Sequence, residues 1–393
     1  MLTIRTSSAV CPLRKRREIF VLGEKRILSL ATGTKCLGAS EASKEGHTVN
    51  DSHAEALARR ALVKYLLTEA YQVLVKHSDS NVFVKDPSSK LLRFKSDLRL
   101  HFVTTHTPCG DASIFPKAVD SDVPAQSSDC DQVAKPSPAK RRREYEEASD
   151  RETNCEPADI YRTGAKCTAD GPQDAHLPGV DYHQLGAWRT KPGRGERTLS
   201  MSCSDKLAKW AIMGVQGALL MHVLAEPLYI DTLIIGGRCP YSEQALRRAI
   251  VERNVAFQGS APFSLHSPKF IYLDTVSFPC RPSEQTDSSR PSHLSLLWHQ
   301  GMPKPEVLVD GYKQGVTLAR RHRESARSVV CRWALARQLN EIVPVSGTKS
   351  YQDTKKSASI YAEVWDQLKS FYKYWICDHR KTDAQQFCVT NTM

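Results

Sequence analysis

The chain has 393 residues, of which 55 are Lys or Arg and 43 are Asp or Glu, so its formal net charge is +12. Its apolar runs are far too short to span a bilayer, and its twelve cysteines are too scattered for the disulfide framework of a small secreted domain. Membrane-spanning, collagen-like and disulfide-scaffold classes are therefore excluded, no membrane partner is expected, and we expect an intracellular protein, in the nucleus, the cytoplasm or both.

A basic N-terminal segment, residues 1–26, is expected to precede one domain over 27–390. Hydrophobic periodicity in the first half of the chain alternates between the strand and the helix pattern. It predicts strands at 19–22, 26–30 and 98–104 and a helix at 53–71. From about 116 to 190 the composition shifts to Ser, Asp, Pro, Glu and Lys, and the scarcity of aliphatic residues there predicts a disordered insertion.

Regular structure is expected to return near Arg197. The patterns predict helices at 204–221 and 242–252, a strand between them at 228–235, and a second polar loop at 281–297. The last stretch, 313–375, is predicted to be mostly helical. The alternation of strands and helices predicts an α/β fold that C-terminal helices complete.

Three short motifs carry residue types that bind zinc. In the first, a helix start with the sequence NDSHAE places His53 and Glu55 in the first turn. The second places Cys109 on the turn after the strand at 98–104, and the third places Cys203 at the start of a helix. One imidazole and two thiolates suit Zn²⁺ and leave a fourth position for water. Glu55 stands where a carboxylate can move protons to and from that water.

The zinc-dependent deaminases of nucleobases carry the pattern H-x-E followed by P-C-x-x-C, which the chain matches only in part. The second cysteine is replaced by Ala112, and Cys203, far downstream, could supply the missing ligand. Two other functions remain open at this point. Ala112 argues against a nucleic-acid cytidine deaminase, and the presence of Glu55 argues against an RNA-binding protein that has lost catalysis.

Longer motifs around these residues closely resemble the adenosine deaminases that act on RNA. The segments are TGTKC at 32–36, NDSHAEALARR at 50–60, PCGDASI at 108–114, KPGRGER at 191–197, SMSCSDK at 200–206 and GVQGALL at 214–220. The resemblance implies a cytidine-deaminase-like mixed sheet sandwiched by helices. It also implies that His53, Cys109 and Cys203 bind one zinc ion and that Glu55 shuttles protons.

Within this family the resemblance is to the members that act on tRNA. It implies hydrolytic deamination of adenosine to inosine during tRNA processing, in alanine tRNA next to the anticodon. We expect no double-stranded-RNA-binding module before the domain, and this expectation also favours tRNA. Thr34 and Arg194 are the expected RNA contacts, although the turn around Arg194 could equally be an ordinary flexible turn.

The resemblance further implies an inositol hexakisphosphate inside the fold, in a basic pocket that the C-terminal helices close. Six phosphates require many Lys and Arg donors. The matching positions are Lys35, Asn50, Arg59, Arg60, Ser200, Lys206, Lys209, Arg332, Tyr351, Lys355, Tyr361, Trp365 and Trp375. Without the resemblance, the Arg pair would be interpreted as a solvated helix face and the aromatic residues as plain helix packing.

Overall fold

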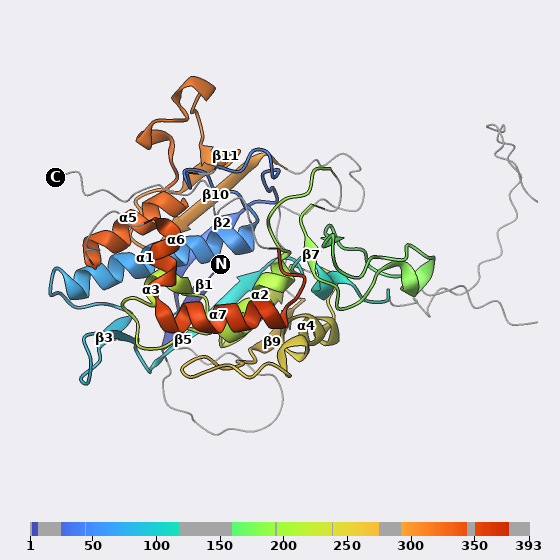
Figure 1. The fold of residues 1–393 in the computed structure, drawn as a ribbon, viewed down its shortest axis with the longest axis horizontal. Helices are drawn as coiled ribbons and strands as arrows, with labels where there is room; N and C mark the ends of the chain where they lie inside the picture. Colours follow the sequence, from blue (N-terminus) through green and yellow to red (C-terminus); the bar gives the residue numbers. More distant parts are fainter. Residues whose placement is uncertain are drawn as a thin grey trace, which may run out of the picture.

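The structure is a computed structural model that describes residues 2–6, 25–43, 45–117, 159–192, 195–237, 239–274, 292–343 and 350–376. Its centre is an eight-stranded mixed sheet, and α1 and α7 cross in front of the strands in Figure 1. This arrangement confirms the α/β prediction. No helix in the described part of the chain is long and apolar enough to cross a membrane.

The sheet has the strand order β12-β11-β10-β2-β1-β5-β8-β9. Only the pairs β5–β8 and β8–β9 are parallel. The strands are β1 (Leu2–Thr6), β2 (Lys25–Thr32), β5 (Leu98–Thr104), β8 (Thr232–Gly236), β9 (Lys269–Leu273), β10 (Leu294–His299), β11 (Glu306–Val309) and β12 (Tyr312–Lys313). The predicted strands at 26–30 and 98–104 are confirmed, the strand at 228–235 begins later, and 19–22 lies outside the described residues.

Five of these strands, β1, β9, β10, β11 and β12, fall where the sequence predicted none, and two of them show why. β1 belongs to the N-terminal segment and pairs with both β2 and β5 in the middle of the sheet. β10 begins inside the expected polar loop at 281–297, of which 281–291 lies outside the described residues. β1 has five residues, and the polar residues at 281–293 obscure the start of β10, so both strands are difficult to recognise from the sequence.

One core joins the sheet to three helices, α1 (Ala54–Leu74), α2 (Cys203–Met213) and α4 (Glu243–Ile250). Buried side chains from all three pack with the inward side chains of β5 and β8, such as Phe102 and Leu233. The helices predicted at 53–71 and 242–252 are confirmed, and Ser242 caps α4 by accepting a hydrogen bond from the Ala245 N–H at 3.2 Å.

The single helix expected over 204–221 is two helices, which corrects that prediction. α2 ends at Met213, and α3 (Gly217–Leu220) begins after a break at Gly214. The backbone of Gly214 has φ +67°, and a Cβ there would lie 2.9 Å from the carbonyl oxygen of Leu228. Only glycine fits this conformation and this close approach, so the break is determined by tertiary contact.

The insertion expected to be disordered over 116–190 is folded from residue 159 onward, and this too corrects the prediction. The folded part contains the two-stranded sheet of β6 (Lys166–Cys167) and β7 (Arg189–Thr190). Residues 118–158 lie outside the described residues.

A buried ion pair explains how such a polar segment folds. The guanidinium of Arg189 is fully buried and donates to the two carboxylate oxygens of Asp174 at 2.7 and 2.5 Å. Composition averaged over the whole insertion cannot reveal one charge pair that is satisfied inside the protein.

In the described part of the C-terminal stretch the α-helices begin at residue 332, after two 3-10 turns at Leu318–Arg320 and Glu324–Ala326, so the prediction for 313–375 holds for about its last two thirds. α5 (Arg332–Ile342) packs on the main core, and α6 (Tyr351–Lys356) leads into α7 (Ser359–Phe371). Val364 and Leu368 of α7 pack on Ile212 at the end of α2, so α7 forms a further layer over α2.

Candidate metal centre and basic pocket

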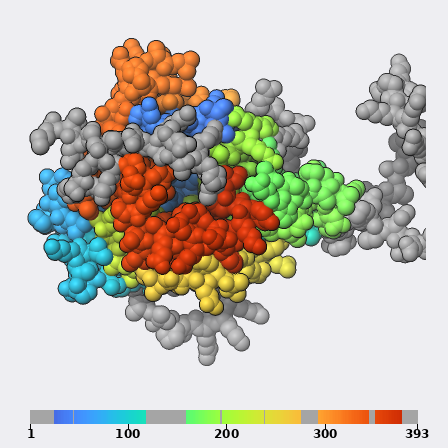
Figure 2. Space-filling view, in the orientation of Figure 1, coloured from blue at the N-terminus to red at the C-terminus, as the bar shows by residue number. Residues whose placement is uncertain are grey.

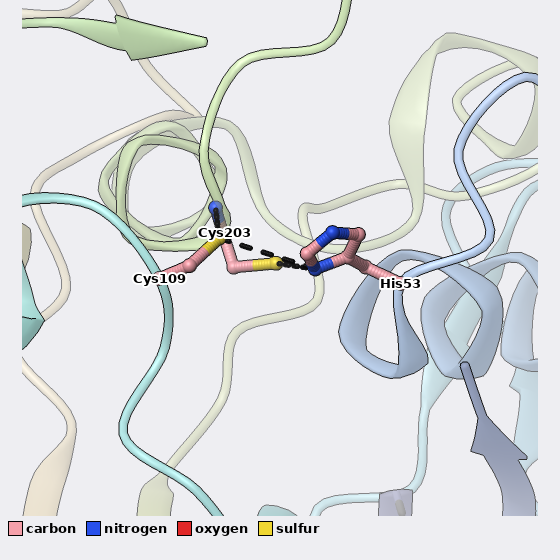
Figure 3. Close-up of side chains that lie close together, drawn as sticks. All are labelled: His53, Cys109 and Cys203. Atoms are coloured by element: carbon pink, nitrogen blue, oxygen red, sulfur yellow. Dashed lines mark hydrogen bonds between the residues drawn. The ribbon is translucent and has the colours of Figure 1, made fainter. Parts of the chain in front are cut away.

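The three predicted zinc ligands lie together. His53 immediately precedes α1, Cys109 follows β5, and Cys203 is the first residue of α2. The Nδ1 atom of His53 is 3.9 Å from the sulfur of Cys109 and 3.7 Å from that of Cys203, and Figure 3 shows both thiols directed at the imidazole. Zinc bonds of about 2.0 Å to nitrogen and about 2.3 Å to sulfur place tetrahedral ligand atoms about 3.6 Å apart. The residues therefore fit one zinc ion.

Close backbone contact brings the two cysteine turns together. The N–H of Cys203 donates to the sulfur of Cys109 at 3.4 Å, and the N–H of Ser204 donates to the carbonyl oxygen of Cys109 at 3.0 Å. A Cβ on Gly110, where φ is +108°, would lie 2.2 Å from the Ser202 hydroxyl, so the approach requires glycine. Hydrogen bonding from Cys203, with the positive charge of Lys191, holds the pKa of Cys109 well below its usual range.

Glu55 lies in the first turn of α1, partly exposed. Burial raises the pKa of Cys203, and the negative charges of Cys109 and Glu55 raise it further. The carboxylate of Glu55 therefore acts electrostatically on the thiol of Cys203. The carboxylate of Glu55 is not among the ligand atoms that converge with His53, so we do not assign Glu55 as a metal ligand.

Asp51 connects His53 to two lysines, although the sequence analysis did not name it as a site residue. Its buried carboxylate accepts hydrogen bonds from the His53 N–H at 3.0 Å, from Lys191 Nζ at 2.9 Å and from Lys206 Nζ. Although burial alone would raise its pKa, the two lysines hold the pKa of Asp51 well below its usual range. The sequence held one signal for this arrangement, because Asp51, Lys191 and Lys206 lie in the motifs NDSHAE, KPGRGER and SMSCSDK.

A second group of possible ligands, Cys36, Asp51 and His53, shares His53 with the first. It fits a metal ion less well, because the carboxylate of Asp51 already binds two lysines and burial raises the pKa of the Cys36 thiol. We therefore place the metal at the two cysteines.

The basic residues predicted to bind a polyanion converge in part. The structure brings Arg59 and Arg60 of α1 near Arg332 of α5 and Lys355 of α6. Burial and the neighbouring cations, chiefly Arg332, lower the pKa of Lys355 to about 8. Among the residues that the structure describes, no carboxylate forms an ion pair with these four. In Figure 2 the C-terminal helices, in red, surround a hollow on this side of the molecule.

Aromatic side chains line the same region. Burial raises the pKa of Tyr361 to about 12, and the nearby Arg59 and Tyr351 also influence it. Lys209 Nζ lies 3.3 Å from the ring centre of Trp365 and 5.7 Å from that of Trp375.

Four other expected ligands of the polyanion have no contact with these four cations among the described residues. Lys206 binds Asp51 beside the metal site, and Asn50 accepts a hydrogen bond from the Thr48 hydroxyl at 3.0 Å. Within the described ranges, no interaction joins Lys35 or Ser200 to the cluster. Of the two expected RNA contacts, Thr34 is exposed and Arg194 lies outside the described residues.

Comparison with known proteins adds to this geometry. The model of the adenosine-deaminase (editase) domain family matches residues 29–379. The chain is 32% identical to tRNA-specific adenosine deaminase 1 of Homo sapiens over 92% of its length and 88% of that protein, and 32% identical to the Drosophila melanogaster protein of that name over 88% and 82%. It is 27% identical to the double-stranded RNA-specific editase Adar of Drosophila melanogaster over 72% of its length and 37% of that protein. The chain belongs to the adenosine-deaminase (editase) domain family and is a hydrolytic deaminase.

Proposed function

We propose that this protein converts adenosine to inosine in tRNA, and that alanine tRNA next to the anticodon is its substrate. The observation that carries the proposal is the convergence of one imidazole and two thiols within 4.8 Å, with Glu55 close enough for its charge to act on the thiol of Cys203. The match to relatives named tRNA-specific over most of both chains supports tRNA as the substrate class.

The residues divide the reaction between them. His53, Cys109 and Cys203 would hold zinc, which as a Lewis acid allows a water molecule to give up its proton near neutral pH. Glu55 accepts that proton and passes it to ring nitrogen N1 as hydroxide adds at C6. It then moves the remaining hydroxyl proton to the amine, and the C6–N bond breaks to release ammonia. The target base must leave its stack, which costs least in a loop that is already single-stranded.

Sequencing tRNA after incubation with the purified protein tests this proposal. We expect inosine in alanine tRNA and none when the same protein carries Glu55→Gln. Uridine in place of cytidine would support the cytidine deaminase instead. A protein that binds tRNA but leaves every base unchanged would support the catalytically inactive alternative.

We also propose that the basic pocket holds an inositol hexakisphosphate. The supporting observation is the group of partly buried cations around Lys355, which repel one another and lack carboxylate partners among the described residues. Many charge-assisted hydrogen bonds to phosphate would replace that repulsion. Mass spectrometry of the denatured protein should release the ligand in a ratio of about one to one, as expected for one enclosed site. A fully active preparation without any inositol phosphate would exclude it.

A further inference from the structure

Each cysteine of the metal site is followed two residues later by a buried aspartate. Asp111 begins a 3-10 turn after Cys109, and Asp205 lies in the first turn of α2 after Cys203. Both carboxylates are 0% exposed. A buried carboxylate requires a cation, so the residue that supplies the cation also determines where each cysteine turn can lie.

Arg253 contacts both carboxylates, whereas Arg248, a second cation at Asp111, donates from Nε to Asp111 Oδ2 at 3.1 Å and makes no ion pair with Asp205 among the described residues. Its Nη1 donates to Asp205 Oδ1 at 2.6 Å and its Nη2 donates to Asp111 Oδ2 at 3.4 Å. The planar guanidinium presents these donors at a fixed spacing, which a lysine cannot do. One side chain thus joins the two turns that carry the thiols.

Neighbouring groups hold Arg253 in place. The guanidinium carbon lies 4.4 Å from the ring centre of Trp188, within cation–π distance. The next residue, Asn254, donates to the carbonyl oxygen of Ala208 in α2 at 2.9 Å and accepts from the Tyr372 hydroxyl at 2.8 Å. Arg253 is therefore fixed by α2 and by the end of the C-terminal helix.

We propose that Arg253 is a positioning residue that sets the separation of the Cys109 and Cys203 thiols and so controls how tightly zinc is held. This inference rests on the proposed zinc site. Residues that orient metal ligands without touching the metal typically change affinity by about 10- to 100-fold when replaced.

Arg253→Met tests the proposal in the full-length protein, with Arg189→Met as its matched control. Arg189 is also a buried arginine of this region, but its side chain binds Asp174 and neither of the two aspartates near the cysteines. The measurements are zinc content, the rate of zinc release to a chelator, and the thermal midpoint of each variant. Arg253→Lys, which keeps the charge, is measured in parallel.

We expect Arg253→Met to release zinc at least about tenfold faster than the wild type, with Arg253→Lys between them. Arg189→Met should lower the thermal midpoint and release zinc at the wild-type rate. Equal release rates for Arg253→Met and the wild type would overturn the proposal, as would equally fast release from both Met variants. If Arg253→Met does not fold, Arg253→Lys against Arg189→Met decides in the same way.

Measurements on the wild type distinguish a failure of this inference from a failure of the proposed zinc site. Wild-type protein that folds but holds no zinc would overturn the metal site and the role of Arg253 together. Wild-type protein that holds zinc and deaminates, while Arg253→Met retains zinc normally, would overturn only the role of Arg253.

Discussion

The imidazole of His53 and the carboxylate of Glu55 stand two residues apart at the start of α1, and their roles separate cleanly. The imidazole faces the two thiols, whereas the carboxylate is not among the converging ligand atoms and acts on Cys203 through its charge. We expect Glu55→Gln to keep zinc and the fold but to lower turnover by about 10²- to 10⁴-fold, because an amide cannot move the proton. Zinc content and the rate of inosine formation measure the two effects. Near-normal turnover would exclude Glu55 as the proton shuttle, and loss of zinc would make it a ligand.

Two cysteines near His53 differ in what surrounds them, and this difference can be tested. Cys203 approaches the imidazole, whereas the thiol of Cys36 donates to Asp51 Oδ1 at 3.0 Å. We expect Cys203→Ala to lose both zinc and activity, because only two protein ligands remain. Cys36→Ala, the matched control, should keep its zinc. Metal analysis of both variants decides, and full zinc in Cys203→Ala would refute the assignment of this remote ligand.

At the scale of elements, the two chain ends that flank residues 118–158 lie side by side. Lys117 N–H donates to the carbonyl oxygen of Asp159 at 2.8 Å, and the Tyr161 N–H donates to that of Phe115 at 2.9 Å. We expect replacement of 118–158 by a short Gly/Ser linker to preserve the thermal midpoint and activity. The linker can connect the two adjacent ends without displacing either of them. Inactivity of a folded deletion protein would give the segment a role in catalysis.

The wider deletion of 116–190 is the contrasting variant. It removes Asp174 and Arg189, whose backbone N–H donates to the buried carboxylate of Asp205 at 2.9 Å. We expect it to unfold or to aggregate, since a buried group that loses its partner costs several kcal/mol. Soluble yield and circular dichroism measure this outcome, and a folded, active product would show that the ordered part of the insertion is dispensable.

These elements also show what the sequence could and could not predict. The ligands His53, Cys109 and Cys203 were predictable because each lies in a short motif at a helix or turn boundary. Their supports were not, because Lys191 and Arg253 reach the site from distant positions through tertiary contacts that no local pattern encodes. The break between α2 and α3 has the same cause, a close approach to Leu228 that only the fold creates.

At the scale of the molecule, the metal site and the basic pocket are linked through α1 and α2. His53 precedes α1, and Arg59 and Arg60 follow about two turns later, while Cys203 and Lys209 share α2. The C-terminal helices pack over both helices, and Tyr372 binds Asn254 beside Arg253. Filling the pocket would therefore tie down the elements that carry the metal ligands.

Lys355 provides a test of that link through pH. Its pKa in the fold is about 8, below the usual 10.5, because burial and Arg332 disfavour its charge. Between these two values the unfolded chain binds the proton and the folded chain does not, so this lysine makes stability rise with pH over about 8 to 10.5. Below pH 8 the full destabilisation is present. Ligand-free wild type should therefore be less stable than Lys355→Met at pH 7, by on the order of 1 kcal/mol, and the difference should shrink toward pH 10.

With inositol hexakisphosphate bound, the order of the two proteins should reverse at pH 7, because phosphate stabilises the lysine charge that methionine lacks. Denaturant unfolding of both proteins, with and without the ligand at pH 7 and pH 9, measures which protein has the larger free energy of unfolding in each state. If the ligand-free wild type does not fold, Lys355→Met should be the protein recovered in folded form. Equal destabilisation by Lys355→Met in both states would show that the cations of the pocket serve packing alone, and that no polyanion is needed to hold the C-terminal helices against the catalytic half.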